Sequence, residues 1–525
     1  MRFLPPYAGV AALPDRRIRS AGYDATVYTA GMLLAQVLLF VAGLAQRRLL
    51  GPTAAGYWSL IGNCTVLFSL TSLGALDGAS RQIPLHRGRG DLRTAGSASD
   101  TGASFSLLAT VIAGSGLAAL ALVFGSHWNP ELRYGLVLAG LIGPVQKLAD
   151  AHEEIVQSTK RFSVSSLVAL VEAAVTVVLQ TAAVWALGYW GMFLGQLLII
   201  AGAFCVWRRM GIAGVRRPAF RWRIEPPRLR ELIRFGVPIM LNGQLWGLFL
   251  VVDNLIVAGF LSVRQLGYYA LACSATTYIM VLPKSVAAAL APRMSERYGE
   301  TGSASAVSRY STGGQQLMAF MLLPVLVAGA FFFMPVLIRQ ALPAFAPAVA
   351  VVRIMVAGSF FVSLTSLPTK ALLASGHRWS VTWLTFSSLV VNGTANLIAV
   401  VVLGGGLTGA ALAVSISYAA AFLLLTTVAG ARSGGGGLPM RHVVEIFAAF
   451  AYTAAAMWGV EVLLGGGGGA LLSDVANATA KFALMVIALV PLLAIAQRRT
   501  GALGALQSLI RGGLRRTRRT IDARS

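Results

Sequence analysis

Long apolar stretches, separated by short segments rich in arginine and lysine, follow one another along most of the chain. A membrane-spanning helix needs about 20 mostly apolar residues, and about fourteen stretches meet this requirement. The weakest is 131–149, because Arg133 and Lys147 leave only a short uncharged middle. The pattern predicts an all-α integral membrane protein with about 14 transmembrane helices, at 25–45, 56–76, 101–125, 131–149, 163–185, 187–207, 235–258, 267–290, 312–338, 347–373, 379–403, 405–430, 445–464 and 475–496.

The composition favours a membrane protein and excludes a water-soluble globule. Hydrophobic residues make up 56% of the 525 residues and charged residues 12%, whereas a soluble domain carries about 25% charged residues. The 43 Lys and Arg against 19 Asp and Glu would suggest nucleic acid on a soluble domain, but here they interrupt apolar runs. We therefore expect anionic membrane lipids, and no nucleic acid, as partners of the basic residues.

The distribution of basic residues predicts the orientation of the helices. Short cytoplasmic loops are enriched in Lys and Arg, so a correct helix count should place these residues on one side. With the N-terminus inside, about 36 basic residues fall in cytoplasmic segments and about 5 in external ones. The bias does not invert along the chain, which favours an even number of helices and two cytoplasmic termini.

The longest polar segment, 208–234, divides the chain after the sixth predicted helix. It contains nine arginines together with Pro218, Pro226 and Pro227, as expected of a cytoplasmic linker between two six-helix halves. The predicted organisation is a cytoplasmic N-terminal segment (1–24), a first lobe (25–207), the basic linker (208–234), a second lobe (235–430), an extra helix pair (431–496) and a basic cytoplasmic tail (497–525).

The two halves also resemble each other in sequence. Residues 50–60 (LGPTAAGYWSL) align with 261–271 (LSVRQLGYYAL), and 160–162 (KRF) align with 377–379 (HRW). Because six helices separate the copies, both have the same orientation, which predicts a parallel repeat with its axis along the membrane normal. The expected architecture is therefore two pseudo-symmetric six-helix lobes plus a C-terminal helix pair.

Several passages resemble polysaccharide flippases of the multidrug/oligosaccharidyl-lipid/polysaccharide (MOP) exporter superfamily. Their order and spacing, more than any single motif, carry the resemblance over most of residues 25–430. The passages are 46–52 (QRRLLGP), 235–238 (FGVP), 252–256 (VDNLI), 266–271 (LGYYAL), 290–295 (LAPRMS), 370–377 (KALLASGH), 396–397 (NL) and 409–411 (GAA).

This resemblance implies alternating access by two lobes in a bacterial cytoplasmic (inner) membrane. The implied substrate is an undecaprenyl-pyrophosphate-linked repeat unit carried to the outer leaflet for surface or exopolysaccharide synthesis. A polysaccharide polymerase or glycosyltransferases are the implied protein partners. Many such flippases have twelve helices, so the extra pair leaves open a lipid II-type flippase of peptidoglycan precursors. A multidrug or cation antiporter of the same superfamily is the other alternative, although the chain offers more intramembrane bases than acids.

An enzymatic function is not expected. Membrane glycosyltransferases, polymerases and ligases usually need a sizeable extramembrane loop with acids or histidines, whereas the predicted external loops are short and the five histidines are scattered. The cysteines, Cys64, Cys205 and Cys273, show no metal-ligand spacing. We predict no catalytic residues, no metal and no cofactor, apart from possible H⁺ or Na⁺ coupling.

Basic residues within apolar stretches are the candidates for substrate binding. A charge at a helix centre costs about 2.5–3.5 kcal/mol on insertion scales, so it needs a partner or a wet cavity. Lys and Arg can replace the hydration of a pyrophosphate by charge-assisted hydrogen bonds. The candidates are Lys284, which has no obvious carboxylate nearby and is the strongest, then Arg353, Arg81, Arg48 and Lys370. For the last three, snorkelling to the interface is the alternative.

Acidic residues in the same stretches are the candidates for ion coupling or gating: Asp253, Glu172 and Asp77. Asp253 and Arg353 should both lie in the outer third of the membrane, so a neutralising ion pair between them is an alternative. Glu172 is the lone acid near the middle of the first lobe, where a hydrogen-bonded structural role is the alternative. The aromatic residues Trp58, Trp190, Tyr268 and Tyr269 are expected in an interfacial belt rather than as sugar-stacking platforms.

Overall fold

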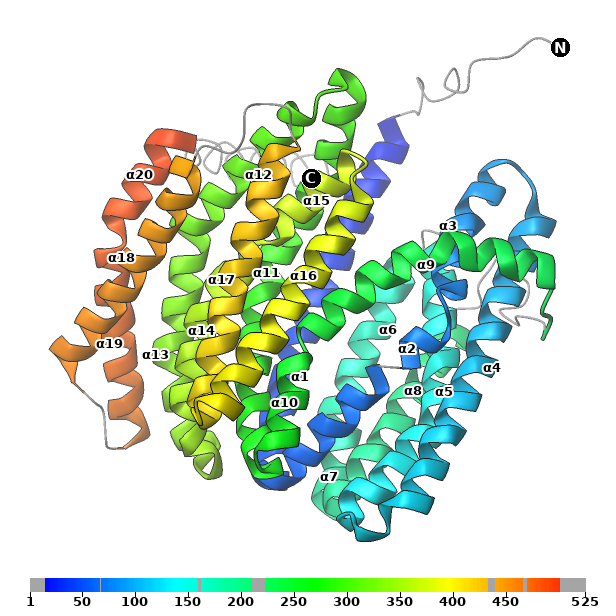
Figure 1. Ribbon diagram of the computed structural model, residues 1–525, viewed down its shortest axis with the longest axis horizontal. Coiled ribbons are helices and arrows are strands. Elements are labelled where there is room, and N and C mark those ends of the chain that lie inside the picture. The colour runs from blue at the N-terminus through cyan, green and yellow to red at the C-terminus, as the bar shows by residue number, and fades with distance from the viewer. Residues whose placement is uncertain are drawn as a thin grey trace, which may run out of the picture. The chain divides into compact units, whose positions relative to one another are not determined.

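The computed structural model describes residues 15–66, 68–158, 162–209, 222–432, 440–465 and 470–500. All regular elements in these ranges are helical (Figure 1), which confirms the all-α class. Of the expected segments, residues 1–14 of the N-terminal segment, 210–221 of the basic linker and 501–525 of the tail lie outside the described residues.

The main helices are, in chain order, α1 (Asp15–Val66), α2 (Phe68–Thr71), α3 (Ala75–Gly88), α4 (Leu92–Phe124), α5 (Pro130–Ser158), α6 (Phe162–Val175), α7 (Thr181–Leu187), α8 (Gly191–Arg209), α9 (Pro226–Phe249), α10 (Val252–Phe260), α11 (Val263–Thr301), α12 (Ala304–Leu317), α13 (Leu323–Ala341), α14 (Val349–Leu364), α15 (Ser366–Ala374), α16 (Arg378–Leu397), α17 (Gly406–Ala431), α18 (Met440–Leu464), α19 (Leu471–Ala488) and α20 (Val490–Thr500).

Many of these helices are suited to cross a membrane. Within the described ranges, ten helices are long and apolar enough, or eleven if α9 and α10, bent by 43° at their junction, form one span. The chain is therefore a multi-pass membrane protein. The weakest predicted stretch lies on α5, which is not among the ten. The number of fourteen spans stays a prediction.

Two of the ten apolar candidate spans are broken at a glycine. In the span Gly31–Thr71, Gly51 has a φ of 71° directly before Pro52 and divides α1. In the span Val164–Trp207, Gly188 has a φ of 58° and ends α7. The following helix, α8, packs against α6 and α7. Residues with a Cβ rarely adopt such φ values. Each of these two spans covers most of two of the predicted stretches.

The chain forms two compact units, Met1–Gln244 and Leu245–Ser525, and the division falls inside α9. In the first unit α4 packs along α5, and α6 packs against α1 and α8. A Cβ added to Gly114 of α4 would collide with the carbonyl oxygen of Gly140 of α5, and the reverse is also true. Small residues of this kind let two helix backbones touch, which is how helices associate within a bilayer.

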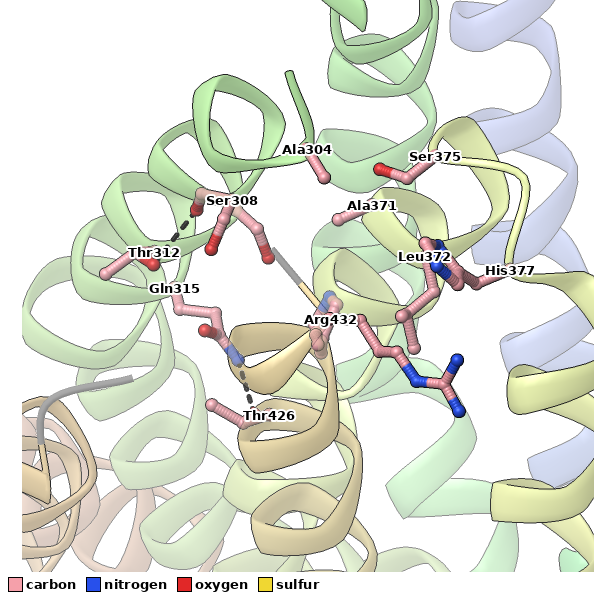
Figure 2. Close-up of a pocket in the computed structure, with 13 residues that line it drawn as sticks. Ala304, Ser308, Thr312, Gln315, Ala371, Leu372, Ser375, His377, Thr426 and Arg432 are labelled. Atoms are coloured by element: carbon pink, nitrogen blue, oxygen red, sulfur yellow. Dashed lines mark hydrogen bonds between the residues drawn. The ribbon is translucent and has the colours of Figure 1, made fainter. Parts of the chain in front are cut away.

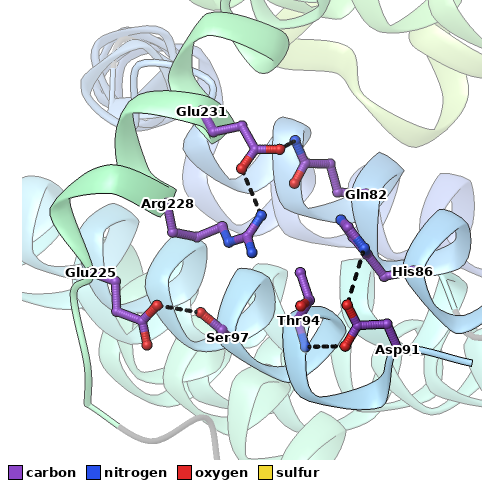
Figure 3. A network of polar contacts seen from close by, with 8 residues as sticks. All are labelled: Gln82, His86, Asp91, Thr94, Ser97, Glu225, Arg228 and Glu231. Carbon is purple, nitrogen blue, oxygen red and sulfur yellow. Dashed lines mark hydrogen bonds and ion pairs between the residues drawn. The ribbon is translucent and has the colours of Figure 1, made fainter.

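The beginning of α9 belongs to the first unit and is held there by polar contacts. Figure 3 shows Glu231 accepting hydrogen bonds from Gln82 of α3 at 3.2 Å and from Arg228 at 2.6 Å. Glu225 accepts from Ser97 of α4 at 2.8 Å. The first turns of α9 are thus tied to both α3 and α4.

Backbone contacts reinforce this attachment of α9. A Cβ at Gly236 of α9 would collide with the carbonyl oxygen of Gly74, and a Cβ at Gly78 of α3 would collide with the carbonyl oxygen of Leu232. Gly74 also has a φ of 72°, so it needs glycine for its conformation as well as for space. Any larger side chain at these positions would separate α9 from α3.

In the second unit α14 packs against α11 and α17, and α16 packs against α17. The largest fully buried side chains are aromatic: Tyr269, Phe249, Phe345, Phe360 and Phe422. The terminal helices α18 and α19 pack against α13. On α18, the rings of Phe447 and Phe450 lie 4.9 Å and 4.6 Å from that of Phe361 on α14. The extra helix pair is therefore part of the apolar packing of the second unit.

Both copies of the sequence repeat lie at a junction between helical segments. The copy at 50–60 spans the break of α1 at Gly51. The copy at 261–271 spans the junction of α10 and α11, where Ser262 begins α11 in a capping box with Gln265. The repeated sequence thus ends one helical segment and begins the next in each unit, as turn and capping signals do.

Candidate functional site

A cavity of about 250 Å³ lies within the first unit. Its walls come from α1 beyond the break at Gly51 and from α2, α4, α5 and α8. The volume is slightly below the ~300–1,000 Å³ of pockets for drug-sized ligands. The cavity is therefore suited to a small group or to one part of a larger ligand.

One wall of this cavity is aromatic. The rings of Trp58 and Phe193 meet edge to face with centroids 5.3 Å apart, a favourable geometry for two aromatic side chains. Phe68 lies over Gly143, where an added Cβ would come within 2.8 Å of its ring, so the glycine makes room for Phe68. Trp58, expected in an interfacial belt, also lines the cavity.

The polar part of the lining, called the polar wall below, is ordered by a chain of amides. Gln196 of α8 donates to the side-chain oxygen of Gln146 at 2.8 Å, and Gln146 donates to Asp150 at 3.0 Å. Lys147 also lines the cavity, and it and Asp150 are the only charged residues among its lining residues. Because each amide is held by a neighbour, the donors and acceptors of this wall have fixed positions.

Acidic residues lie near the polar wall. Asp77 of α3 and Glu154 of α5 are electrostatic neighbours of Lys147, and Glu172 of α6 is a neighbour of Glu153 and Asp150. The structure thus brings the two coupling candidates of the first lobe, Asp77 and Glu172, to the same segment of α5. Within the described ranges, His, Cys, Asp and Glu form no group of three or more that could hold a metal ion.

In the second unit, Asp253 is 1% exposed and lies just after the bend between α9 and α10. Its Oδ2 accepts a hydrogen bond from the Tyr269 hydroxyl at 2.5 Å, while its buried Oδ1 has no hydrogen-bond partner in the described part of the chain. Asn392 of α16 donates to the carbonyl oxygen of Phe249 at the bend. Tyr269, expected at the interface, is therefore a buried partner of Asp253.

Arg353 does not pair with Asp253, the partner considered for it as an alternative. Its guanidinium donates to Glu461 of α18 at 2.9 Å, and Lys481 of α19 reaches the other oxygen of Glu461 at 2.9 Å. The suggested pair of Asp253 and Arg353 is wrong, because Asp253 instead accepts from Tyr269. Arg353 also lies over the ring of Phe331, 4.7 Å from its centroid. These contacts join α14 to both helices of the terminal pair.

The other cationic candidates are exposed: Lys284, Arg81, Arg48 and Lys370. None of them forms a salt bridge within the described residues. Lys284 lies in the middle of the long helix α11, between two prolines at 283 and 292. An apolar helix that keeps an unpaired ammonium group needs water or an anion beside it. Lys284 therefore meets the requirement for a substrate-binding cation better than the paired Arg353.

Figure 2 shows a second recess, between α12, α15 and α17 in the second unit. It contains Gln315, which donates to the Thr426 hydroxyl at 3.0 Å, with Ser308, Thr312 and His377 nearby. Its volume of about 10 Å³ is room for about one water molecule. This recess is too small for a ligand, and we take the cavity of the first unit as the candidate binding site.

Known transporter structures share this arrangement of helices. An inward-facing multidrug resistance MATE family transporter of the MOP superfamily has 16% identity and a TM-score of 0.63 over 77% of this chain and 98% of its own. The lipid II flippase MurJ, in an inward closed conformation, has 14% identity and a TM-score of 0.67 over 90% of this chain and 99% of its own.

A third similar structure is a MOP superfamily transporter from Pyrococcus furiosus whose binding pocket is described as reversed in polarity. It has 15% identity and a TM-score of 0.56 over 78% of this chain and 95% of its own. The protein thus has the fold of the MOP superfamily of membrane transporters.

Residues 44–343 match the sequence model of the family described as polysaccharide biosynthesis protein. The match covers more than half of the chain, and the protein belongs to this family. No curated protein sequence matches the chain.

Proposed function

We propose that this protein flips a lipid-linked oligosaccharide repeat unit across a bacterial cytoplasmic membrane. In this proposal the glycan is carried on undecaprenyl pyrophosphate, from the cytoplasmic to the outer leaflet, by alternating access of two lobes. The observation that carries it is membership of a polysaccharide biosynthesis family in a chain with a transporter fold. We further propose fourteen spans with both termini in the cytoplasm, since this arrangement places the basic loops on one side.

The charged head of such a substrate needs cations along its path. Lys284 is an exposed cation near the middle of α11 that forms no salt bridge within the described residues, and Arg48, Arg81 and Lys370 are further exposed cations. Ammonium and guanidinium groups replace the water around a pyrophosphate by charge-assisted hydrogen bonds. We assign Lys284 the main contact to the pyrophosphate, while Arg353 serves mainly to hold α18 through Glu461.

Transport against a gradient needs an energy source, and buried acids are the candidate coupling groups. Asp253 combines nearly complete burial, one unpartnered oxygen in the described part and a place beside a helix bend. A carboxylate in this setting binds H⁺ or Na⁺ readily, because neutralisation removes the cost of a buried charge. Asp77 and Glu172, with the acids of α5, form the second candidate group.

Flipping of a peptidoglycan precursor is the second candidate function. The similarity to the lipid II flippase spans 90% of the chain, against 77% for the MATE transporter. It thus extends further along the chain than the multidrug similarity does. The two candidate functions share the pyrophosphate and the polyprenyl chain and differ in the glycan.

The test is deletion of the gene, with surface polysaccharide and lipid-linked intermediates of the cytoplasmic leaflet scored together. Loss of the polymer with accumulation of complete repeat units is expected. Accumulation of lipid II with arrested cell-wall synthesis would select the second candidate. Unchanged glycans together with increased drug sensitivity would overturn both and assign the protein to multidrug export.

A further inference from the structure

The cavity of the first unit presents both aromatic and polar groups to a small ligand. Trp58, Phe68 and Phe193 supply aromatic surface, and Gln146, Gln196 and their neighbours supply hydrogen-bonding groups. A sugar ring has the same division, because its C–H groups form apolar faces while its hydroxyls form a polar rim. Ligand sites commonly combine an apolar surface with a few fixed polar groups that set orientation.

The charge of the cavity lining favours a neutral ligand. Its two charged lining residues, Lys147 and Asp150, have opposite signs, and Lys147 has further acidic neighbours in Asp77 and Glu154. A pyrophosphate would need a surplus of cations that this lining does not offer. Asp150 is hydrogen-bonded to Gln146, so a cationic drug would meet an acid whose charge is already partly compensated.

The polar wall still has hydrogen-bonding capacity for hydroxyl groups. Gln146 and Gln196 each use one N–H in the amide chain, and each amide group has a second N–H. The hydroxyls of Thr65 and Thr110 donate to the carbonyl oxygens one turn earlier on their own helices, at 2.8 Å in both cases. Their oxygens therefore remain as acceptors. A hydroxyl is both donor and acceptor, so it can pair with either kind of group.

We propose that this cavity is a sugar-recognition subsite that holds one ring of the lipid-linked glycan, with Trp58 against the ring face and Gln146 and Gln196 at its hydroxyl rim. The inference rests on the proposed flippase function and deepens it. It assigns glycan recognition to the first unit, separate from the contact of Lys284 with the pyrophosphate. The size of the cavity, about 250 Å³, limits this contact to a small part of the repeat unit.

The experiment compares two ligands on the purified full-length protein in lipid nanodiscs. One ligand is the lipid-linked repeat unit that the deletion strain accumulates, and the other is undecaprenyl phosphate, which carries no sugar. Binding is measured for the unmodified protein, Trp58→Leu, Trp58→Phe and the double variant Gln146→Leu with Gln196→Leu. Trp185→Leu is the matched control, because Trp185 lies in the same unit but is 77% exposed and does not line the cavity.

We expect Trp58→Leu and the double glutamine variant to weaken binding of the glycan-bearing lipid by about tenfold or more, since a site built for hydroxyls loses affinity when its partners are removed. Binding of undecaprenyl phosphate should stay within about twofold of the unmodified protein, because its polyprenyl and phosphate contacts are unchanged. Trp58→Phe should retain most of the preference for the glycan, since it keeps an aromatic face.

If Trp58→Leu and the double glutamine variant lost affinity for both lipids equally, or for neither, the sugar subsite would be overturned. Equal affinity of the unmodified protein for the two lipids would overturn it as well. Failure of the proposed function looks different, because the deletion strain would then accumulate no lipid-linked repeat unit. The control variant should match the unmodified protein with both ligands.

Discussion

The two units use the charges of their helices in opposite ways. In the first unit, Lys147 and Asp150 border a cavity, and Glu154 is a further acidic neighbour of Lys147. In the second unit, Arg353, Glu461 and Lys481 form one connected ion-pair cluster between three helices. Charges that line a cavity set the net charge of the ligand that it favours, whereas charges that satisfy one another hold helices together. A charge in a transmembrane helix is thus assigned a role by its partners and not by its depth alone.

The largest effect is expected when the ion-pair cluster of the second unit is broken. Glu461→Ala would leave Arg353 and the buried Lys481 without their shared acid. Because Arg353 and Glu461 are partly exposed, the cost should lie between about 1 kcal/mol for an exposed pair and about 3–5 kcal/mol for a fully buried one. We expect a strong loss of folded protein from the membrane and a lower unfolding temperature in detergent. Arg441→Ala is the control, since Arg441 is exposed and pairs with Glu445 on the same helix, a contact worth about 1 kcal/mol or less.

If Glu461→Ala left stability unchanged, the cluster would not be structural, and Arg353 would return to the substrate-binding candidates.

Lys284, in contrast to the paired Arg353, is a cation without an ion-pair partner in the described structure, so its removal should affect transport and not stability. Lys284→Ala should abolish glycan export while the amount of protein in the membrane stays the same, because the ammonium group forms no salt bridge in the described structure. Export of surface polysaccharide, normalised to protein abundance, is the measurement. Trp190→Phe is the control and should have little effect. Normal export by the Lys284 variant at matched abundance would remove this residue from the substrate path.

Asp253 tests whether a buried acid of the second unit serves coupling rather than packing. Asp253→Asn keeps an oxygen that can accept from the Tyr269 hydroxyl, so the fold should persist, but the amide cannot exchange a proton or hold a cation as a carboxylate does. We expect export to fall by about tenfold, within the usual range of coupling energies. Tyr269→Phe, which keeps the carboxylate, should cause a smaller loss.

Ion dependence of export should disappear with Asp253→Asn. If export and its response to H⁺ and Na⁺ gradients both stayed normal, the coupling role would pass to the acids near α5.

The smallest expected effect comes from an exposed acid of the first unit. Asp91 precedes α4 and accepts from the backbone N–H of Thr94 at 3.0 Å (Figure 3). Hydrogen bonding to Thr94 lowers the pKa of Asp91 below its usual value of 3.8. A lowered folded-state pKa stabilises the fold above the unfolded-state pKa, and this contribution is lost as the pH falls through the folded-state pKa.

Asp91→Ala should therefore lower the unfolding temperature slightly at pH 7, and the difference from the unmodified protein should shrink as the pH falls below about 4. A difference that stayed constant down to pH 3 would show that the ionised carboxylate does not contribute. Thermal unfolding in detergent across this pH range is the measurement.

Much of the helical plan could be predicted from the sequence, because hydropathy is a local property of each stretch. The helix junctions at 50–60 and 261–271 were also predictable, since turn and capping residues mark them. The partner of Arg353 could not be predicted, because Glu461 is 108 residues away and depth alone suggested Asp253. The cavity could not be predicted either, since hydropathy does not distinguish a residue that faces lipid from one that faces the interior, as Trp58 shows.

The attachment of α9 to α3 and α4 has a consequence for protein engineering. Hydrogen bonds from Gln82 to α9 and from Ser97 to Glu225, together with the glycine contacts at Gly74 and Gly236, hold α9 and the residue before it to the first unit. Two separately expressed fragments, ending at Arg209 and beginning at Trp222, should therefore reassemble into a functional protein. Such a split protein would allow each half to carry its own label.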